Sequence, residues 1–366
     1  MARLPTIADV AERAGVSRQT VSNVLNSPDI VLGATRERVE GAIRELGFVR
    51  NDSARRLRTR ASSAIGFRLD PERDGMSGVV HDRFLHALTE QLDGRGMRIT
   101  LFTASDLDDE IAHYASLRDR AEVDAVIFTG TGYRDPRFAW LVDNGLPFVA
   151  FGRPWGADVD DPSLAWVDVD GRAGTAAATS HLRHRGLERI GFLGWPLDDL
   201  VGGERWEGWA ADLRAAFGYD DATLDALSFT SQESVRDARQ AVEALFARPE
   251  GPGLDALVCA SDSLALGAMM AVREAGQPHF PVIGFDNTAV SKAVGLSSVD
   301  QRLDEVAAAA IEILMGTAGR RVLPTHEATA QRHRLITPRL VVRRSSHLAP
   351  VDETLPEPGA GTREEP

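Results

Sequence analysis

The stretch TIADVAERAGVSRQTVSNVLN, Thr6–Asn26, predicts two short helices joined by a tight turn. The first helix has an apolar stripe at helical spacing, made by Ile7, Val10 and Ala11. Gly15 is expected to end that helix, because glycine takes a left-handed backbone without strain. Ser17 is expected to cap the second helix, since its hydroxyl can accept from the free N–H groups of the first turn.

The second helix of this stretch has two different faces. Its inward side chains are apolar: Val21, Val24 and Leu25. Its other side chains are slim and polar and lie near the helix N-terminus: Arg18, Gln19, Thr20, Ser22 and Asn23. Arginine beside glutamine suits guanine and adenine edges and is not needed for packing. The pattern is typical of a helix-turn-helix that enters the DNA major groove, and the alternative is two helices of an ordinary bundle.

A third helix is predicted to follow, over Thr35–Leu46, with Thr35 as its cap and Gly47 at its end. Its apolar face consists of Val39, Ala42, Ile43 and Leu46. Three helices are enough to close a small core, so a headpiece is expected over residues 1–50.

Charge divides the chain in the same place. Residues 1–60 hold 11 Arg and 7 acidic residues, a net charge of +4, whereas the remainder of the chain carries −17. Nucleic acid is therefore expected to meet only the N-terminal end. The segment NDSARRLRTR, residues 51–60, has four arginines and is too short and polar to be a stable free helix. It could fold on phosphates and present Leu57 as a minor-groove wedge, and the alternative is a flexible linker.

From residue 63 onward, short apolar runs alternate with amphipathic stretches. The predicted strands are residues 64–69, 98–103, 125–130, 148–152, 189–194, 256–261 and 281–286. Between them the predicted helices include residues 82–95, 106–120, 171–185, 205–217, 231–247 and 263–276. Such alternation indicates an α/β fold with parallel sheets covered by helices, and the pattern repeats in two halves. We therefore expect two similar lobes with a ligand cleft at the strand ends, and a disordered Pro-, Gly- and Glu-rich tail over residues 347–366.

Several other classes of protein are not supported by the sequence. Cys259 is the only cysteine, so it can form no intrachain disulfide, and it lies in an apolar run without an activating base. His181 and His184 lack the acid or cysteine set that a metal site needs, and the Gly130–Gly132 turn lacks a third glycine for a dinucleotide site. With no signal core and no apolar run of membrane length, we expect a cytoplasmic, non-enzymatic protein without cofactor or metal.

The chain resembles the lactose/galactose repressor family over residues 5 to about 344. The resemblance rests on TIADVAERAGVSRQTVSNVLN, TRERVEGAIRELGF and NDSARRL, and on blocks such as ERWEGW, ASDSLALGAM and VIGFDNT. It implies a helix-turn-helix headpiece (1–50), a hinge helix (51–60) and a two-lobed, periplasmic-binding-protein-like domain with Rossmann-like lobes (61–346). The implied boundaries put one lobe at about 61–162 plus 290–321 and the other at about 163–289 plus 322–346, with three crossovers between them.

The resemblance also implies which residues meet DNA. Those matching phosphate-contacting or neighbouring positions are Thr6, Ser17, Thr20, Ser22 and Asn26. Those matching base-reading positions are Arg18, Gln19 and Asn23. The hinge positions are Asn51, Ala54 and Leu57, of which Ala54 and Leu57 match residues that enter the minor groove at the centre of a two-fold operator.

In the cleft, Arg205 matches an arginine that contacts sugar hydroxyls in relatives, and Asp286 matches an acidic cleft residue. The other expected ligand contacts are Arg153, Trp195, Ser261 and Asp262. Bidentate polar groups beside an aromatic face are what polyol recognition needs. The alternatives are that Asp286 caps a loop, that Arg205 forms a surface ion pair, and that Trp206 and Trp209 are core residues.

Together these features predict a ligand-responsive transcription regulator, a repressor of carbohydrate-utilisation genes that binds a near-palindromic operator as a homodimer. A small molecule, expected to be a sugar, would bind in the cleft, and the apolar helix over 263–272 is an expected dimer contact. The alternatives are a sugar-binding transport component and a nucleoside- or purine-responsive regulator. An enzyme is a third option that no nucleophile–base set supports.

Overall fold

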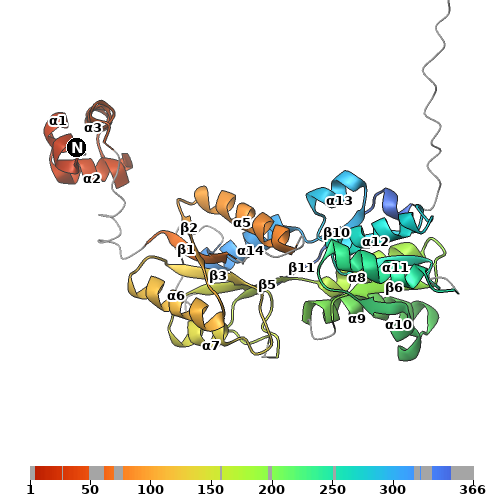
Figure 1. Cartoon of the computed structure of the whole chain (residues 1–366). Coiled ribbons are helices and arrows are strands. Elements are labelled where there is room, and N and C mark those ends of the chain that lie inside the picture. The colour runs from red at the N-terminus through yellow and green to blue at the C-terminus, as the bar shows by residue number, and fades with distance from the viewer. Residues whose placement is uncertain are drawn as a thin grey trace, which may run out of the picture. The chain divides into compact units, whose positions relative to one another are not determined.

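A computed structural model describes residues 5–26, 28–48, 62–69, 77–156, 159–196, 200–249, 253–316, 322 and 332–347. The chain forms two compact units, residues 1–61 and 62–366 (Figure 1). Three of the predicted DNA contacts, Asn51, Ala54 and Leu57, lie outside the described residues. So does the expected tail, apart from its first residue.

The first unit is a three-helix headpiece built from α1 (Ile7–Ala14), α2 (Arg18–Asn26) and α3 (Gly33–Leu46), with a 3-10 turn over Pro28–Ile30. Its core side chains are Val10, Ala11, Ala14, Val21, Val24, Val39, Ala42 and Phe48. Gly15 ends α1 with φ of 64°, as expected. Ser17 begins α2, because its Oγ accepts from the Thr20 backbone N–H at 3.1 Å.

The start of α3 differs from the prediction. The helix begins at Gly33, and Thr35 lies inside its first turn, where the Thr35 N–H donates to the Leu32 carbonyl at 2.9 Å. Leu32 is the N-cap and provides no side-chain acceptor. Threonine is a good N-cap by residue type, but the N-cap of α3 is Leu32, three residues before Thr35.

The second unit contains two six-stranded sheets among its described residues, in the orders β11-β5-β4-β3-β1-β2 and β12-β10-β9-β8-β6-β7. The first lobe consists of β1 (Ala64–Leu69), α5 (Ser77–Asp93), β2 (Arg98–Thr103), α6 (Leu107–Asp119), β3 (Ala125–Thr129), α7 (Pro136–Asp143), β4 (Phe148–Phe151), β5 (Trp166–Val169), α14 (Leu303–Met315) and β11 (His333–Ile336). All strand pairs of this sheet are parallel. In Figure 1, α5 and α14 cover one face of the sheet, and α6 and α7 cover the other.

The second lobe consists of α8 (Gly171–Arg183), β6 (Ile190–Gly194), α9 (Leu200–Phe217), α10 (Asp221–Leu227), β7 (Ser228–Thr230), α11 (Val235–Phe246), β8 (Ala256–Cys259), α12 (Asp262–Glu274), β9 (Val282–Phe285), α13 (Ala289–Val294), β10 (Ser297–Asp300) and β12 (Arg339–Val341), with a 3-10 turn at Arg344–Ser346. Only the β10–β12 pair is antiparallel among the strand pairs of this sheet that the structure describes. The expected α/β fold with two parallel-sheet lobes is confirmed.

The lobe boundaries differ from those expected at each crossover. β5 pairs with β4 and β11 in the first sheet, so the chain leaves the first lobe after residue 169 rather than 162. β10 pairs with β9 in the second sheet, so the return comes after residue 300 rather than 289. β11 also belongs to the first sheet, so the last crossover falls between 336 and 339 rather than at 322.

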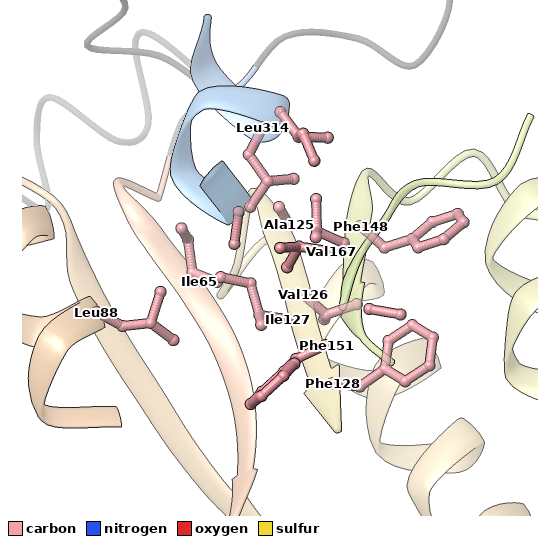
Figure 2. Packing of buried hydrophobic residues seen from close by; sticks show 14 of the residues in the cluster. Ile65, Leu88, Ala125, Val126, Ile127, Phe128, Phe148, Phe151, Val167 and Leu314 are labelled. Atoms are coloured by element: carbon pink, nitrogen blue, oxygen red, sulfur yellow. The ribbon is translucent and has the colours of Figure 1, made fainter. Parts of the chain in front are cut away.

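Each lobe has its own hydrophobic core. In the first, α14 contributes Leu314 and α5 contributes Leu88 beside strand residues such as Ile65 and Val167 (Figure 2). In the second, Trp209 is fully buried and its indole Nε1 donates to the Ile190 carbonyl at 3.0 Å. Trp209 is therefore a core residue, as one alternative held, and Trp206 packs on it at 6.0 Å between ring centroids.

Candidate functional site

The polar side chains of α2 are exposed or half-buried in the headpiece, and none of the five predicted near its N-terminus is fully buried. Arg18 and Gln19 are exposed, and Thr20, Ser22 and Asn23 are half-buried. The Gln19 Nε2 donates to the Asn23 Oδ1 at 3.0 Å, so these two amides are aligned one helical turn apart. Thr6 is exposed and caps α1 in a reciprocal pair with Asp9. Asn26 is the last residue of α2.

The second unit holds a cavity of about 200 Å³ between its two lobes. The first lobe lines it with Val80, His81, Gly130, Thr131, Phe151, Gly152, Trp155, Asp168 and Val169. The second lobe lines it with Gly171, Trp195, Val201, Glu204, Arg205, Glu233, Ser261 and Asp286, and Gln301 lies at a crossover. Many of these residues come directly after a strand, because the carboxyl ends of the parallel strands of both sheets open toward this space.

Arg205 of α9 is the central cation of the cavity and is only 6% exposed. Its Cζ lies 3.7 Å from the centroid of the Phe285 ring and 5.2 Å from that of Trp195, so the guanidinium is held between two aromatic faces. Its Nη1 donates to the Ala260 carbonyl and lies 3.9 Å from the Asp286 Oδ1. Arg205 is therefore a buried cavity residue and does not form the surface ion pair that the sequence left as an alternative.

Glu233, which no sequence motif indicated, also lines the cavity and contacts the Trp195 indole on which Arg205 stacks. Its Oε2 accepts from the Trp195 indole at 2.6 Å and from the Ser261 hydroxyl at 2.7 Å. Its Oε1 is buried and has no hydrogen-bond partner among the described residues. The same is true of two donors in the lining, the Nε of Arg205 and the indole Nε1 of Trp155. Buried polar atoms are costly without partners, so these three mark where a ligand would bind.

Asp286 is held in an unusual conformation at the end of β9. Its φ is 110°, a region that non-glycine residues rarely enter, and the next residue, Asn287, has φ of 48°. Its Oδ1 accepts from the Gln301 amide at 2.6 Å. Burial raises the pKa of Asp286 to about 8; the nearby Arg205 opposes this, whereas Asp262 and Glu233 add to it. Asp286 is thus a cavity carboxyl that holds its proton at neutral pH.

Two of the predicted ligand residues lie elsewhere. Asp262 is fully buried and is absent from the lining. Its carboxylate accepts from the Thr288 N–H and hydroxyl, both at 2.8 Å, and from the Ser298 hydroxyl at 2.6 Å. It therefore ties α12 to the loop after β9.

Arg153 is the second residue that does not line the cavity. Its Nε donates to the Asp168 Oδ2 at 2.7 Å, and its Nη2 lies 3.0 Å from the Glu204 Oε1. Among the other predictions, Trp195, Arg205, Ser261 and Asp286 do line the cavity. Ser261 also caps α12, since its Oγ accepts from the Leu264 N–H at 3.2 Å.

A buried ion network supports one wall of the cavity. Arg137, fully buried in the first lobe, lies 3.1 Å from Glu110 and 2.6 Å from Asp135. Its guanidinium also donates to the carbonyls of Thr129 at 3.1 Å and Gly130 at 2.9 Å. These bonds fix the loop after β3, which lines the cavity.

Other features have structural rather than chemical roles. Cys259 is buried, which raises the pKa of its thiol and keeps it unreactive. His181 is half-buried, and its Nε2 is 3.1 Å from the Ser346 Oγ. In the described ranges, no cluster of three His, Cys, Asp or Glu side chains is placed to hold a metal ion. None of the described helices combines the length and apolar character needed to cross a bilayer.

Two family models match the chain. The one described as bacterial regulatory proteins of the lacI family matches residues 6–51. The one described as periplasmic binding proteins and sugar binding domain of the LacI family matches residues 80–343, which is more than half of the chain. The chain belongs to the LacI family. It is therefore a DNA-binding transcription regulator whose two-lobed unit responds to a small ligand.

Individual LacI-family relatives are similar over nearly the whole chain. The HTH-type transcriptional regulator CelR of Thermobifida fusca is 31% identical over 88% of this chain and 97% of its own length. The maltose regulon regulatory protein MalI of Escherichia coli K12 is 31% identical over 92% of this chain and 97% of its own length. The solved complex of the regulator CelR with cellobiose is 28% identical, covers 93% of this chain and 99% of that one, and has a TM-score of 0.62.

Proposed function

We propose that this LacI-family protein is a repressor of carbohydrate-utilisation genes, released from or retained on its operator by a neutral sugar in the cavity. The observation that carries the proposal is a set of buried polar atoms that have no partner in the described part of the chain, two donors and one acceptor, in a lining that includes Trp155 and Trp195. Sugar hydroxyls both donate and accept, and sugar C–H faces stack on indoles. One such ligand would meet all of these groups.

The charges of the cavity favour a neutral sugar over a phosphorylated one. Among the described lining residues, Asp168, Glu204 and Glu233 add three carboxyl groups to that of Asp286, which keeps its proton at neutral pH. The only arginine in that lining, Arg205, already donates to the Ala260 carbonyl and stacks on Phe285. The Nε of Arg205 is a single buried donor without a partner among the described residues, whereas a phosphate needs several charge-assisted donors.

The size of the cavity favours a small ligand. Its volume of about 200 Å³ is below the roughly 300–1,000 Å³ of sites for drug-sized molecules. A monosaccharide is the better fit in this lobe arrangement. CelR has been solved with cellobiose and MalI is named for the maltose regulon, so disaccharides of glucose belong in the same screen.

The operator would be read by the open face of α2. We assign positions at or next to the phosphates to Thr6, Ser17, Thr20, Ser22 and Asn26, and base contacts to Arg18, Gln19 and Asn23. In the hinge, we assign minor-groove contacts to Ala54 and Leu57 and a further DNA contact to Asn51. Two headpieces of a homodimer would occupy successive major grooves of a near-palindromic site. The protein acts by binding, with neither an enzymatic step nor a cofactor.

Gln19→Ala tests the reading face. It should relax discrimination at one base pair of each half-site by roughly 1–3 kcal/mol, the usual value of a bidentate amide–adenine contact. The measurement is fluorescence anisotropy on the operator selected from a random library and on its single-base variants. Glu45→Gln, near the end of α3, is the control. Equal preference profiles for Gln19→Ala and the unsubstituted protein would remove this assignment.

Thermal-shift measurements test the effector. Glucose, cellobiose and maltose are compared with glucose 6-phosphate and adenosine, since a ligand raises the unfolding temperature with its concentration. We expect a shift with at least one neutral sugar, no shift with the phosphorylated sugar, and a change in operator affinity with the sugar that binds. A shift only with adenosine, or only with the phosphate ester, would overturn the neutral-sugar effector while leaving the operator assignment standing.

A further inference from the structure

Arg153 joins the two lobes at one side of the cavity. It follows β4 in the first lobe and is fixed there by Asp168 of β5. Its other partner, Glu204, belongs to α9 of the second lobe, at 3.0 Å. All three side chains are largely buried, with 18%, 15% and 13% of Arg153, Asp168 and Glu204 exposed. Burial raises the pKa of Glu204, and the nearby Arg153 guanidinium opposes that rise.

Arg83 joins the lobes through a second set of contacts. It lies on α5 of the first lobe and is half-buried. Its Nη1 donates to the backbone carbonyls of Asp286 at 2.8 Å and Asn287 at 3.3 Å, both in the loop after β9 of the second lobe. These are the two residues with positive φ, so Arg83 binds a strained loop from across the cleft.

Each contact holds a residue that lines the cavity, Glu204 in one case and Asp286 in the other. Glu204 directly precedes Arg205 on α9, and Arg83 holds the carbonyl of Asp286 itself. Both arginines belong to the first lobe, and both partners belong to the second. We propose that Arg83 and Arg153 form a clasp that holds the two lobes together across the cavity without a ligand, and that positions Arg205 and Asp286 for ligand binding.

The clasp biases one lobe arrangement because its bonds exist only in that arrangement. Charge-assisted hydrogen bonds between partly buried groups are stronger than exposed ion pairs, which contribute little. Opening the lobes would separate Glu204 from Arg153, which stays paired with Asp168 in the first lobe, and would remove Arg83 from the strained loop after β9. Apparent affinity for an effector decreases when a smaller fraction of the protein is in the arrangement that binds it. By keeping most of the protein in that arrangement, the clasp would increase the apparent affinity for an effector that binds between the lobes.

The test measures the distance between the lobes directly and needs no ligand. Cys259 is buried, so cysteines introduced at the exposed positions Glu122 of the first lobe and Asp225 of the second are the only accessible thiols in the described residues. Spin labels at Glu122→Cys and Asp225→Cys in the full chain are read by double electron–electron resonance. Singly labelled protein identifies any distance between subunits.

Arg153→Gln and Arg83→Gln are each expected to raise the ratio of long to short inter-lobe distances about tenfold, the order expected for one coupled contact. The matched controls are Arg214→Gln, which breaks an ion pair to Glu207 and Asp221 within the second lobe, and Arg118→Gln, which loses Asp119 and Asn144 within the first. These controls should leave the distribution unchanged.

Two outcomes would overturn the clasp. One is an unchanged distance distribution in the Arg83→Gln, Arg153→Gln double variant whose near-ultraviolet circular dichroism shows native packing. The other is an equal change in the control variants. Should Arg153→Gln fail to fold, Glu204→Gln removes the same contact from the other lobe and should give the same shift. The result does not depend on which ligand the cavity binds, so it can fail or hold independently of the sugar proposal.

Discussion

At Asp286, one side chain combines a left-handed backbone, deep burial and a place in the cavity wall. In the unfolded chain its carboxyl would titrate near the ordinary value of 3.8, whereas in the fold its pKa is about 8. The folded chain therefore keeps a proton over a pH range in which the unfolded chain has lost it. A group of this kind stabilises the fold at low pH and loses that contribution as pH rises.

The pH dependence of stability should reveal this proton. From about pH 4 to about pH 8, the free energy of unfolding of the unsubstituted protein should fall relative to that of Asp286→Asn, which cannot ionise. Urea denaturation at a series of pH values measures the difference, and Asp225→Asn, an exposed carboxyl of α10, is the control. Parallel curves for Asp286→Asn and the unsubstituted protein would show that Asp286 is not protonated in the fold.

Glu233 is the residue whose removal tests the acceptor side of the proposed sugar site. Glu233→Gln replaces a charged acceptor with a neutral amide, so affinity for the sugar found in the thermal screen should fall about tenfold or more. Isothermal titration calorimetry gives the dissociation constant. Glu243→Gln, an exposed pair partner of Arg239 on α11, provides the comparison, and equal affinities for both variants would contradict the assignment.

At this scale, the sequence predicted part of the cavity. Trp195, Arg205, Ser261 and Asp286 line it because each lies at or near a strand end on the opening side. Arg153 and Asp262 are in equivalent positions along the chain, but Arg153 bonds to carboxylates in both lobes and Asp262 turns toward buried hydroxyls. Glu233 lies just before α11, where the sequence shows an ordinary polar helix start and gives no sign of burial.

At the scale of elements, the close approach of α8 and α9 sets the position of Arg205. A Cβ on Gly208 of α9 would lie 2.1 Å from the Arg172 carbonyl oxygen and 2.3 Å from the Thr175 Oγ1. Thr175 also donates its hydroxyl to the Arg205 carbonyl at 2.7 Å. The two helices can therefore touch only because residue 208 has no side chain.

Gly208→Ala should force the helices apart. We expect a loss of about 1–3 kcal/mol in the free energy of unfolding, the usual cost of overpacking, together with weaker sugar binding because α9 carries Arg205. Gly203→Ala on the same helix is the matched control, since nothing lies within 4 Å of its added Cβ, and it should be neutral or stabilising. Chemical denaturation compares the two, and equal stabilities would contradict the argument.

The sequence predicted strands in runs of five or six mostly apolar residues, and the strands that it missed have only three or four residues. The boundaries of β1 and β2 agree with the sequence prediction because AIGFRL and RITLFT have clear ends. β10, with the sequence SSVD, was missed because its buried serines look like a loop. The structure satisfies them internally, with Ser298 donating to Asp262 and Ser297 donating to the Arg343 carbonyl.

At the scale of the whole molecule, the homodimer is the main expectation still to be tested. The apolar helix expected as a contact, α12, uses most of its apolar side chains inside its own lobe, and Met270 stays 43% exposed. Multi-angle light scattering at micromolar protein should give twice the mass of the 39.6 kDa chain. A monomeric mass that persists with operator DNA present would rule out symmetric binding by two headpieces.

The alternation of strands and helices along the sequence predicted the two-lobed α/β architecture, but it did not predict where the chain crosses between the lobes. Parallel pairing joins β5 and β11 to the first sheet although they are separated by more than 160 residues. Such pairing depends on which edge of a sheet is free. The local sequences of β5 (WVDV) and β11 (HRLI) do not indicate to which sheet each strand belongs. The lobe boundaries could therefore be read only from the three-dimensional structure.

The threading of the chain through both lobes has a consequence for its synthesis on the ribosome. The headpiece core is complete once Phe48 has emerged, whereas the first lobe lacks α14 and β11 until residues 303–336 are made. At roughly 5–20 residues per second, the delay between the two is on the order of tens of seconds. A nascent chain can thus present a finished operator-binding module well before it can sense any effector.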